Sequence, residues 1–249
     1  MTETMHRLRE LKLDGMYRAL QALQDMGDSS LATLWPILAR LVEAEAEFRR
    51  QSRAERLRKQ AQFRYAASLQ TVATGIERNL DKATLIRLAD CRWVASGQTI
   101  LITGPTGAGK SYLASALGHH ACLQGYKTRY CNCNRLWAQL RQDRNRDRYE
   151  KELRSLSKVD VLILDDFGLS KLEAPDRLSF LEILEDRWGK TSTMVVSQRP
   201  FETWHEVIGE PTVADAICDR LFSYAEKIEL KGESLRKTHK NIDSNLPPH

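Results

Sequence analysis

The stretch LITGPTGAGKSYL, residues 101–113, constrains the fold of this chain more than any other feature. Its Gly104, Gly109, Lys110 and Ser111 match the pattern G-x-x-x-x-G-K-[ST], with a short apolar run before them and a helical pattern after them. Glycines let successive backbone N–H groups curl around phosphate oxygens, and the N-terminus of the following helix adds partial positive charge. The stretch therefore predicts a strand, a phosphate-binding loop and a helix, in that order.

The ligand expected at this loop is ATP with Mg²⁺. Lys110 is expected to reach the β- and γ-phosphates, and Ser111 to bind Mg²⁺. The whole predicted cradle consists of Gly104, Pro105, Thr106, Gly107, Ala108, Gly109, Lys110 and Ser111.

The run VDVLILDDFG is a buried apolar strand that ends in two carboxylates, Asp165 and Asp166. In phosphate-loop ATPases a strand beside the loop strand ends in an Asp that holds Mg²⁺, and this gives Asp165 its expected role. Asp166 is the candidate base for the attacking water. Many related ATPases carry Glu there, and because Asp is one methylene shorter, we expect slow hydrolysis that DNA or a partner stimulates. The alternative is a strand end capped by solvated acids.

Short apolar runs alternate with helical segments from Gln98 onward, which is typical of a buried parallel sheet. They predict an α/β fold with a central five-stranded parallel sheet flanked by helices, its strands at 99–103, 128–133, 159–165, 193–197 and 225–230. The predicted organisation is a small N-terminal helical domain at 1–68, a linker with short helices at 69–97, the ATPase core at 98–240 and a loose tail at 241–249.

The N-terminal region reads as two helices. One amphipathic helix is expected through Leu8 and Leu23, and a longer one from about Leu34 to Gln62, with Pro36 in its first turn. An N-cap is expected within GDSS, residues 27–30. The charged N-terminus lacks the apolar block of a signal peptide, and no apolar run is long enough for a membrane span, so we expect a cytoplasmic protein without a membrane partner.

Four stretches together resemble the AAA+ class of phosphate-loop ATPases and, more narrowly, the IstB-like helper ATPases of insertion-sequence transposition, which are related to the helicase loader DnaC. They are GPTGAGKSYLASALGHHA, VDVLILDDFGLSKL, MVVSQRPFETWHEVI and DAICDRLFSYAEKIELKGESLRK. The N-terminal LRELKLDGMYRAL also resembles the start of these proteins, so the resemblance covers nearly the whole chain.

This resemblance implies further roles. Gln198, or the neighbouring Ser197, would sense the γ-phosphate, Arg220 would be an arginine finger toward the nucleotide of an adjacent subunit, and Arg236 would be a second sensor. A finger of this kind works only between subunits, so the resemblance implies self-association into an ATP-dependent oligomer. It also implies duplex DNA and an IstA-like transposase as partners.

Two basic clusters are candidates for DNA binding in a chain whose net charge is only +5. The first lies within residues 48–64 and offers Arg49, Arg53, Arg56 and Lys59 at helical spacings, although a solvated face or a subunit contact would explain it equally. The second lies within residues 140–158, where an exposed loop is the alternative, and contains Arg141, Arg144, Arg146 and Arg148.

The function expected from these features is that of an ATP-dependent DNA-binding AAA+ ATPase. It would oligomerise on duplex DNA and help a transposase select or capture target DNA, with hydrolysis driving release. A DnaC-like helicase loader is the alternative with the same core. A phosphate-loop small-molecule kinase is a more remote one, since it would need an acceptor pocket and a catalytic lid.

Overall fold

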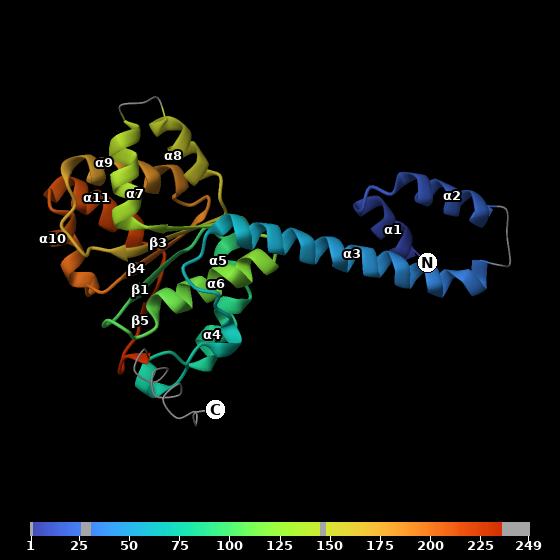
Figure 1. Ribbon diagram of the computed structural model, residues 1–249, viewed down its shortest axis with the longest axis horizontal. Helices are drawn as coiled ribbons and strands as arrows, with labels where there is room; N and C mark the ends of the chain where they lie inside the picture. The colour runs from blue at the N-terminus through green and yellow to red at the C-terminus, as the bar shows by residue number, and fades with distance from the viewer. Residues whose placement is uncertain (1, 26–30, 145–147, 236–249) are drawn as a thin grey trace, which may run out of the picture. The chain divides into compact units, whose positions relative to one another are not determined.

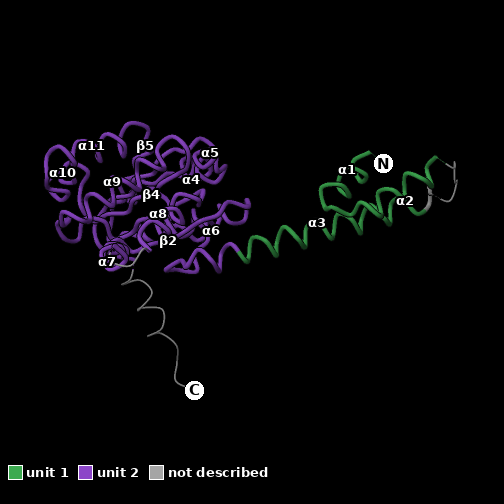
Figure 2. Tube along the Cα trace, turned by 90° about the horizontal axis from the view of Figure 1, so that it is seen from above, with its two compact units in different colours: residues 1–56 green, residues 57–249 purple. Residues whose placement is uncertain are grey.

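The computed structural model describes residues 2–25, 31–144 and 148–235. The chain divides into two compact units, residues 1–56 and 57–249 (Figure 2). This division falls earlier than the boundary at residue 68 suggested by the sequence. The reason is that Leu57 and Ala61 are buried together with Cys122 of the second unit. The limits of the linker and of the ATPase core stay predictions.

The first unit contains helix α1 (Thr2–Glu10), helix α2 (Asp14–Asp25) and most of helix α3 (Leu31–Ala61). The expectation of one helix through Leu8 and Leu23 was wrong, because the chain breaks between α1 and α2, where Lys12 takes a left-handed φ of 56°. Helix α3 begins earlier than expected, so Pro36 lies inside the helix rather than in its first turn. The N-cap expected within residues 27–30 lies outside the described residues.

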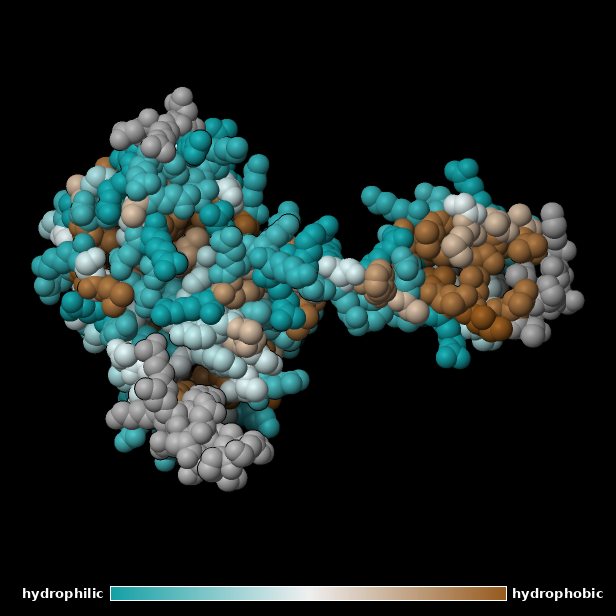
Figure 3. Space-filling view, viewed as in Figure 1, coloured by the Kyte–Doolittle hydropathy of each residue, from teal (hydrophilic) through white to brown (hydrophobic). Residues whose placement is uncertain are grey.

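The first unit buries little apolar surface of its own. Leu8 and Val42 are buried, whereas a set of large apolar side chains is exposed (Figure 3). This exposed set comprises Met16, Leu23, Leu34, Ile37, Leu41 and Phe48. Exposed apolar patches of this kind mark interaction surfaces in many proteins.

The second unit is built on a five-stranded sheet in the order β2-β3-β4-β1-β5, in which all neighbouring strands are parallel. Its strands are β1 (Thr99–Thr103), β2 (Thr128–Asn132), β3 (Val161–Phe167), β4 (Ser192–Ser197) and β5 (Ala225–Glu229). The expected α/β class and parallel sheet are therefore confirmed. The strand bounds differ from those expected by at most two residues.

Helices cover both faces of this sheet (Figure 1). Because side chains alternate between the faces of a strand, Ile100 and Ile102 pack on one face and Leu101 on the other. The first face is covered by α4 (Lys82–Ala89), α5 (Arg92–Ala95) and α6 (Lys110–Leu123). The second is covered by α7 (Cys133–Asp143), α8 (Tyr149–Ser157), α9 (Ala174–Arg187), α10 (Trp204–Ile208) and α11 (Pro211–Phe222).

Three short 3₁₀ helices complete the described secondary structure, at Leu69–Thr71, Ile76–Arg78 and Phe201–Thr203. Across the described ranges, none of the helices combines the length and the apolar character needed to cross a membrane.

Candidate nucleotide-binding site

The loop between β1 and α6 has the backbone that a phosphate cradle requires. Gly104, Gly107 and Gly109 all take positive φ, at 143°, 85° and 94°. A Cβ on Gly104 would lie 2.2 Å from the carbonyl oxygen of Leu230, and one on Gly107 would lie 2.1 Å from Ser234 Oγ. These two positions therefore accept glycine alone, for reasons of both conformation and space.

Helix α6 begins directly at the end of this loop. No side chain caps its N-terminus, where Gly109 is the N-cap residue. The first N–H groups of a helix have no intrahelical partner, and together with the helix dipole they form a ready anion site. The loop and the helix start therefore present backbone donors suited to phosphate oxygens.

Lys110 lies within the loop rather than in solvent. Its side chain is buried, and Nζ donates a hydrogen bond of 2.9 Å to the carbonyl oxygen of Pro105. The ammonium group is thus folded over the cradle, at the position from which it would meet the phosphates of a bound nucleotide.

Asp165 and Asp166 sit on an irregularity of β3. The pairing of β3 with β4 runs from Leu164 opposite Val195 to Phe167 opposite Ser197, so β3 holds one residue more than its neighbour there. Asp166 takes a left-handed φ of 61°. A bulge of this kind turns side chains away from the regular alternation, and it lets both carboxylates serve one site.

The carboxylate of Asp165 is fully buried and accepts several hydrogen bonds. Its Oδ1 accepts from Ser111 Oγ at 3.0 Å and from the backbone N–H of Asp166 at 2.9 Å. Its Oδ2 accepts from the hydroxyl of Tyr130 and, at 3.4 Å, from Arg64 Nη1. Burial, with the neighbouring charge of Asp165, raises the pKa of Tyr130, so this hydroxyl keeps its proton and remains a donor.

Ser111 and Asp165 fit a magnesium ion. The two side chains reach each other from different elements, α6 and β3, directly beside the phosphate loop. Hydroxyl and carboxylate oxygens are ligands that Mg²⁺ prefers, and phosphate oxygens and water complete its shell in nucleotide sites. The structure thus brings together the two residues that the sequence suggested as metal ligands.

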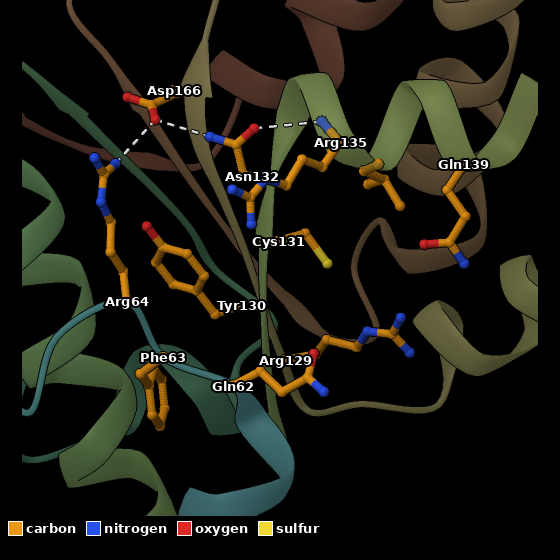
Figure 4. A pocket seen from close by; sticks show the side chains of 11 residues that line it. Gln62, Phe63, Arg64, Arg129, Tyr130, Cys131, Asn132, Arg135, Gln139 and Asp166 are labelled. Atoms are coloured by element: carbon orange, nitrogen blue, oxygen red, sulfur yellow. Dashed lines mark hydrogen bonds and ion pairs between the residues drawn. The ribbon is translucent and has the colours of Figure 1, made fainter.

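Asp166 faces a pocket of about 510 Å³ at the end of β2 and β3 (Figure 4). Its Oδ2 accepts hydrogen bonds from Asn132 Nδ2 at 2.8 Å and from Arg64 Nη1 at 2.9 Å. Arg129 and Arg135 also line this pocket. The candidate base is therefore held by two donors from outside the phosphate loop.

Gln198, the expected sensor, contacts the phosphate loop. Its Oε1 accepts a hydrogen bond of 2.7 Å from Thr106 Oγ1. The alternative candidate Ser197 is buried, donates to the carbonyl oxygen of Phe167 and accepts from the N–H of Arg199. Of these two candidates, Gln198 is therefore the one that contacts the phosphate loop.

Of the two candidate arginines from the C-terminal part of the chain, the structure describes Arg220 but not Arg236. Arg220 donates to Glu185 on α9 at 2.8 Å and to the carbonyl oxygen of Ala216 at 2.8 Å. Its described partners thus lie on α9 and α11 and not in the phosphate loop. Arg236 lies outside the described residues, although Leu235 before it donates from its N–H to the carbonyl oxygen of Gly107 at 3.0 Å.

The DNA-binding candidates that the structure describes lie in different surroundings. Arg49 pairs with Glu45 at 2.6 Å, and Arg53, Arg56 and Lys59 are exposed on α3. Arg141 pairs with the buried Asp176 at 2.5 Å. Arg144 donates to the side chains of Tyr149 and Ser179 and to the carbonyl oxygen of Pro175, Arg148 is exposed, and Arg146 lies outside the described residues.

Sequence reasoning missed three side chains of this site, Arg64, Tyr130 and Asn132. In the sequence Arg64 is the last residue of the basic cluster at 48–64, and Tyr130 and Asn132 lie within the strand predicted at 128–133, where the pattern indicates no role for them. The pairing of β2 with β3 sets Asn132 opposite Asp165. A polar residue at the end of a predicted parallel strand was the available signal, since such ends meet at one edge of a sheet.

The chain is similar over most of its length to proteins described as ATP-binding, which agrees with the phosphate loop found in the structure. The family described as IstB-like ATP binding protein matches residues 6–242. A protein of Sinorhizobium fredii named as a putative insertion sequence ATP-binding protein is 40% identical over 237 residues, which cover 95% of this chain and 97% of that protein. The putative ATP-binding protein of insertion sequence IS1162 from Pseudomonas fluorescens is 41% identical over 201 residues, with 80% and 87% covered.

A solved structure is similar in fold. The crystal structure of the DnaC helicase loader has a TM-score of 0.57 and 18% sequence identity, and the match covers 67% of this chain and 98% of that chain. At this identity the likeness concerns the fold alone.

Proposed function

Because the chain belongs to the IstB-like ATP-binding proteins, which have the AAA+ fold, we propose that it hydrolyses ATP and uses the nucleotide to assemble on duplex DNA for a transposase. The observation that carries the ATPase part is the hydrogen bond between Ser111 and Asp165, which unites the phosphate loop with the acidic end of β3.

Each side chain of the site has a role in this reaction. Lys110 and the loop N–H groups hold the β- and γ-phosphates, and Gln198 lies beside the γ-phosphate. Ser111 and Asp165 hold Mg²⁺, which when bound neutralises charge that develops on the phosphate oxygens. The site then provides positioning and electrostatic stabilisation, the two main contributions to phosphoryl transfer.

Asp166 orients the attacking water and takes its proton. The water oxygen forms a bond to the γ-phosphorus while the bond from that phosphorus to the bridging oxygen breaks, and ADP and phosphate result. Asn132 and Arg64 both donate to Oδ2 of Asp166. Among the described residues, none donates a hydrogen bond to its Oδ1. Oδ1 is thus the oxygen available to the water. Because the hydrogen bonds from Asn132 and Arg64 restrain the carboxylate of Asp166, we expect a slow reaction that DNA or a partner accelerates.

The DNA part of the proposal rests on the relatives, which are named for insertion sequences, and on the exposed basic side chains of α3. Arg53, Arg56 and Lys59 would contact phosphates of the duplex without reading its sequence. Arg220 would leave Glu185 and reach the nucleotide of an adjacent subunit, so that ATP links subunits together. The exposed apolar set of the first unit adds a surface for self-association or for the transposase.

Binding to labelled duplex DNA with ATP, with ADP and without nucleotide, at two salt concentrations, tests this function. We expect binding that requires ATP, weakens steeply as salt rises and comes with an increase in particle size by light scattering. Binding that is indifferent to nucleotide would contradict the ATP-dependent assembly. Capture of a replicative helicase instead of the transposase would favour the helicase loader, and transfer of phosphate to an added metabolite would favour a kinase.

A further inference from the structure

Arg64 lies against both carboxylates of the site although it comes from a distant part of the sequence. Its Nη1 is 2.9 Å from Asp166 Oδ2 (Figure 4). The same Nη1 is 3.4 Å from Asp165 Oδ2. The Arg64 side chain is 40% exposed, whereas that of Asp165 is almost completely buried. One cation of the chain itself therefore pairs with both acids to which the metal and the water role were assigned above, and it offsets part of their negative charge.

The segment that carries Arg64 is fixed to helix α6 on both sides of the arginine. The ring of Phe63 stacks on His119 with centroids 4.2 Å apart, and a Cβ on Gly118 would lie 2.5 Å from the Phe63 ring. His119 Nε2 is 3.0 Å from the carbonyl oxygen of Tyr65. Helix α6 thus positions Arg64 in front of the carboxylates, and it is the same helix that begins at the phosphate loop.

The hydrogen bonds of His119 fix its tautomer. Arg58 Nε donates to Nδ1 at 3.0 Å, so Nδ1 is the unprotonated nitrogen and Nε2–H donates to Tyr65. The imidazole therefore joins the last turns of α3 to the residue after Arg64. Leu57 and Ala61 strengthen the same attachment, since they are buried against Cys122 of α6.

We propose that Arg64 is the resting counter-cation of the carboxylate pair and competes with Mg²⁺ at Asp165. This inference concerns the regulation of the ATPase site and rests on the function proposed above. A guanidinium and a divalent cation on one carboxylate repel each other strongly at such short separation. Loading of Mg²⁺ with the nucleotide then expels Arg64, which also frees Asp166 Oδ2 from one of its two donors.

The consequence is that binding of the nucleotide changes the contacts of residues 57–65. In the resting state Arg64 ties this segment to β3, and in the loaded state this tie is lost while the contacts with α6 remain. Because the segment continues the basic helix α3, its release gives ATP a route to the proposed DNA-binding residues that does not pass through the phosphate loop.

The Mg²⁺ dependence of nucleotide binding by the full chain tests this competition. A fluorescent ADP analogue would be titrated at a series of Mg²⁺ concentrations into the wild type, Arg64→Gln and Arg64→Lys. We expect Arg64→Gln to reach half-saturation at a Mg²⁺ concentration about five- to tenfold lower than the wild type, which is a modest coupling between two sites. Arg64→Lys keeps the charge without the planar fork and should lie between them.

Arg87→Gln is the matched control, because Arg87 also pairs with a carboxylate of the second unit, at 2.6 Å from Glu226, but away from the loop. Its Mg²⁺ dependence should equal that of the wild type. An unchanged or increased Mg²⁺ requirement in Arg64→Gln would overturn this inference but not the proposed function. If Arg64→Gln does not fold, the same result in Arg64→Lys would do so. A wild type that binds no nucleotide at any Mg²⁺ concentration would overturn the proposed function as well.

Discussion

Asn132 donates a hydrogen bond of 2.8 Å to the carboxylate of Asp166 across the neighbouring strands β2 and β3. The amide oxygen of the same side chain accepts from the backbone N–H of Arg135 and caps helix α7. One side chain thus links the candidate base to the start of a helix on the second face of the sheet. The position of Asp166 and the start of α7 are therefore coupled.

Asn132→Ser should raise turnover without DNA by about tenfold, the lower end of the range for the loss of one hydrogen bond to a charged group. Serine keeps an oxygen for the N-cap but is too short to reach Asp166. Steady-state release of phosphate measures the effect, and nucleotide affinity should not change. Asn134→Ser, at an exposed position of α7, is the control. Lower turnover in Asn132→Ser would indicate that Asn132 positions Asp166 for the reaction instead.

Lys110→Ala should weaken ATP binding by about 100-fold, the upper range for hydrogen bonds to a charged group. Since Lys110 Nζ donates to the carbonyl oxygen of Pro105, a residue of the same loop, we expect the fold to remain. Isothermal titration with an ATP analogue measures the affinity, and thermal unfolding checks the fold. Lys190→Ala, on an exposed loop, is the control. Unchanged affinity in Lys110→Ala would refute the assignment of the phosphate loop.

Asp166→Asn should keep ATP binding and lower turnover by roughly 10²- to 10⁴-fold, the usual contribution of a general base. Asn tolerates the left-handed φ of 61° at this position better than most other residues with a side chain do, so the bulge of β3 should persist. Single-turnover hydrolysis measures the rate, with Asp186→Asn on the exposed face of α9 as the control. A normal rate would show that another residue orients the water.

The sequence predicted those parts of the site that depend on local spacing. The loop residues, Ser111 and Asp165 follow from a short pattern and from a strand end, and the structure places them together. Arg64 and Tyr130 could not be found in this way, and Asn132 only as a polar residue at the end of a predicted strand. Their roles depend on β2 lying next to β3 and on the path of the chain after α3, and both are long-range properties that no local pattern encodes.

The break between α1 and α2 was missed for a related reason. The apolar residues keep helical spacing through the break, so periodicity alone joins the two helices. Lys12 in left-handed conformation and the N–H of Leu13 bonded to the carbonyl oxygen of Leu8 end the first helix without any Gly or Pro to mark it.

A comparison of Gly104→Ala with Gly75→Ala separates two reasons why the phosphate loop needs glycine at position 104. One is the positive φ, and the other is the lack of space for a Cβ. The two glycines have nearly the same φ, 143° and 144°, but only Gly104 has a backbone oxygen in the way of a Cβ. Gly75→Ala should cost about 1 kcal/mol through backbone strain. Gly104→Ala should cost about 2 kcal/mol more through the clash with Leu230.

Thermal unfolding without nucleotide measures this difference. For a chain of this size each kcal/mol lowers the midpoint by roughly 2–4 °C, so Gly104→Ala should unfold at a clearly lower temperature than Gly75→Ala. Equal midpoints for the two variants would mean that Leu230, which follows β5, moves away freely and that its close approach to the loop is not constrained.

Protonation of His119 should release the segment around Arg64 at acid pH. Burial, together with the charge of Arg58, lowers the pKa of His119 below its usual value of about 6.5, although the hydrogen bond to Tyr65 opposes this. The unfolded state then binds the proton more readily than the folded state. The stability that the neutral imidazole provides is therefore complete above about pH 6.5 and is lost as pH falls through the folded pKa.

Hydrogen exchange of residues 57–65, corrected for the intrinsic effect of pH, measures this release. Protection should be constant above about pH 7 and should decline below about pH 6.5, because protonated Nδ1 can no longer accept from Arg58. In His119→Gln the decline should disappear, and protection should be low at every pH. Constant protection of the wild type down to about pH 5 would mean that Phe63 and the buried Leu57 and Ala61 hold the segment without the imidazole.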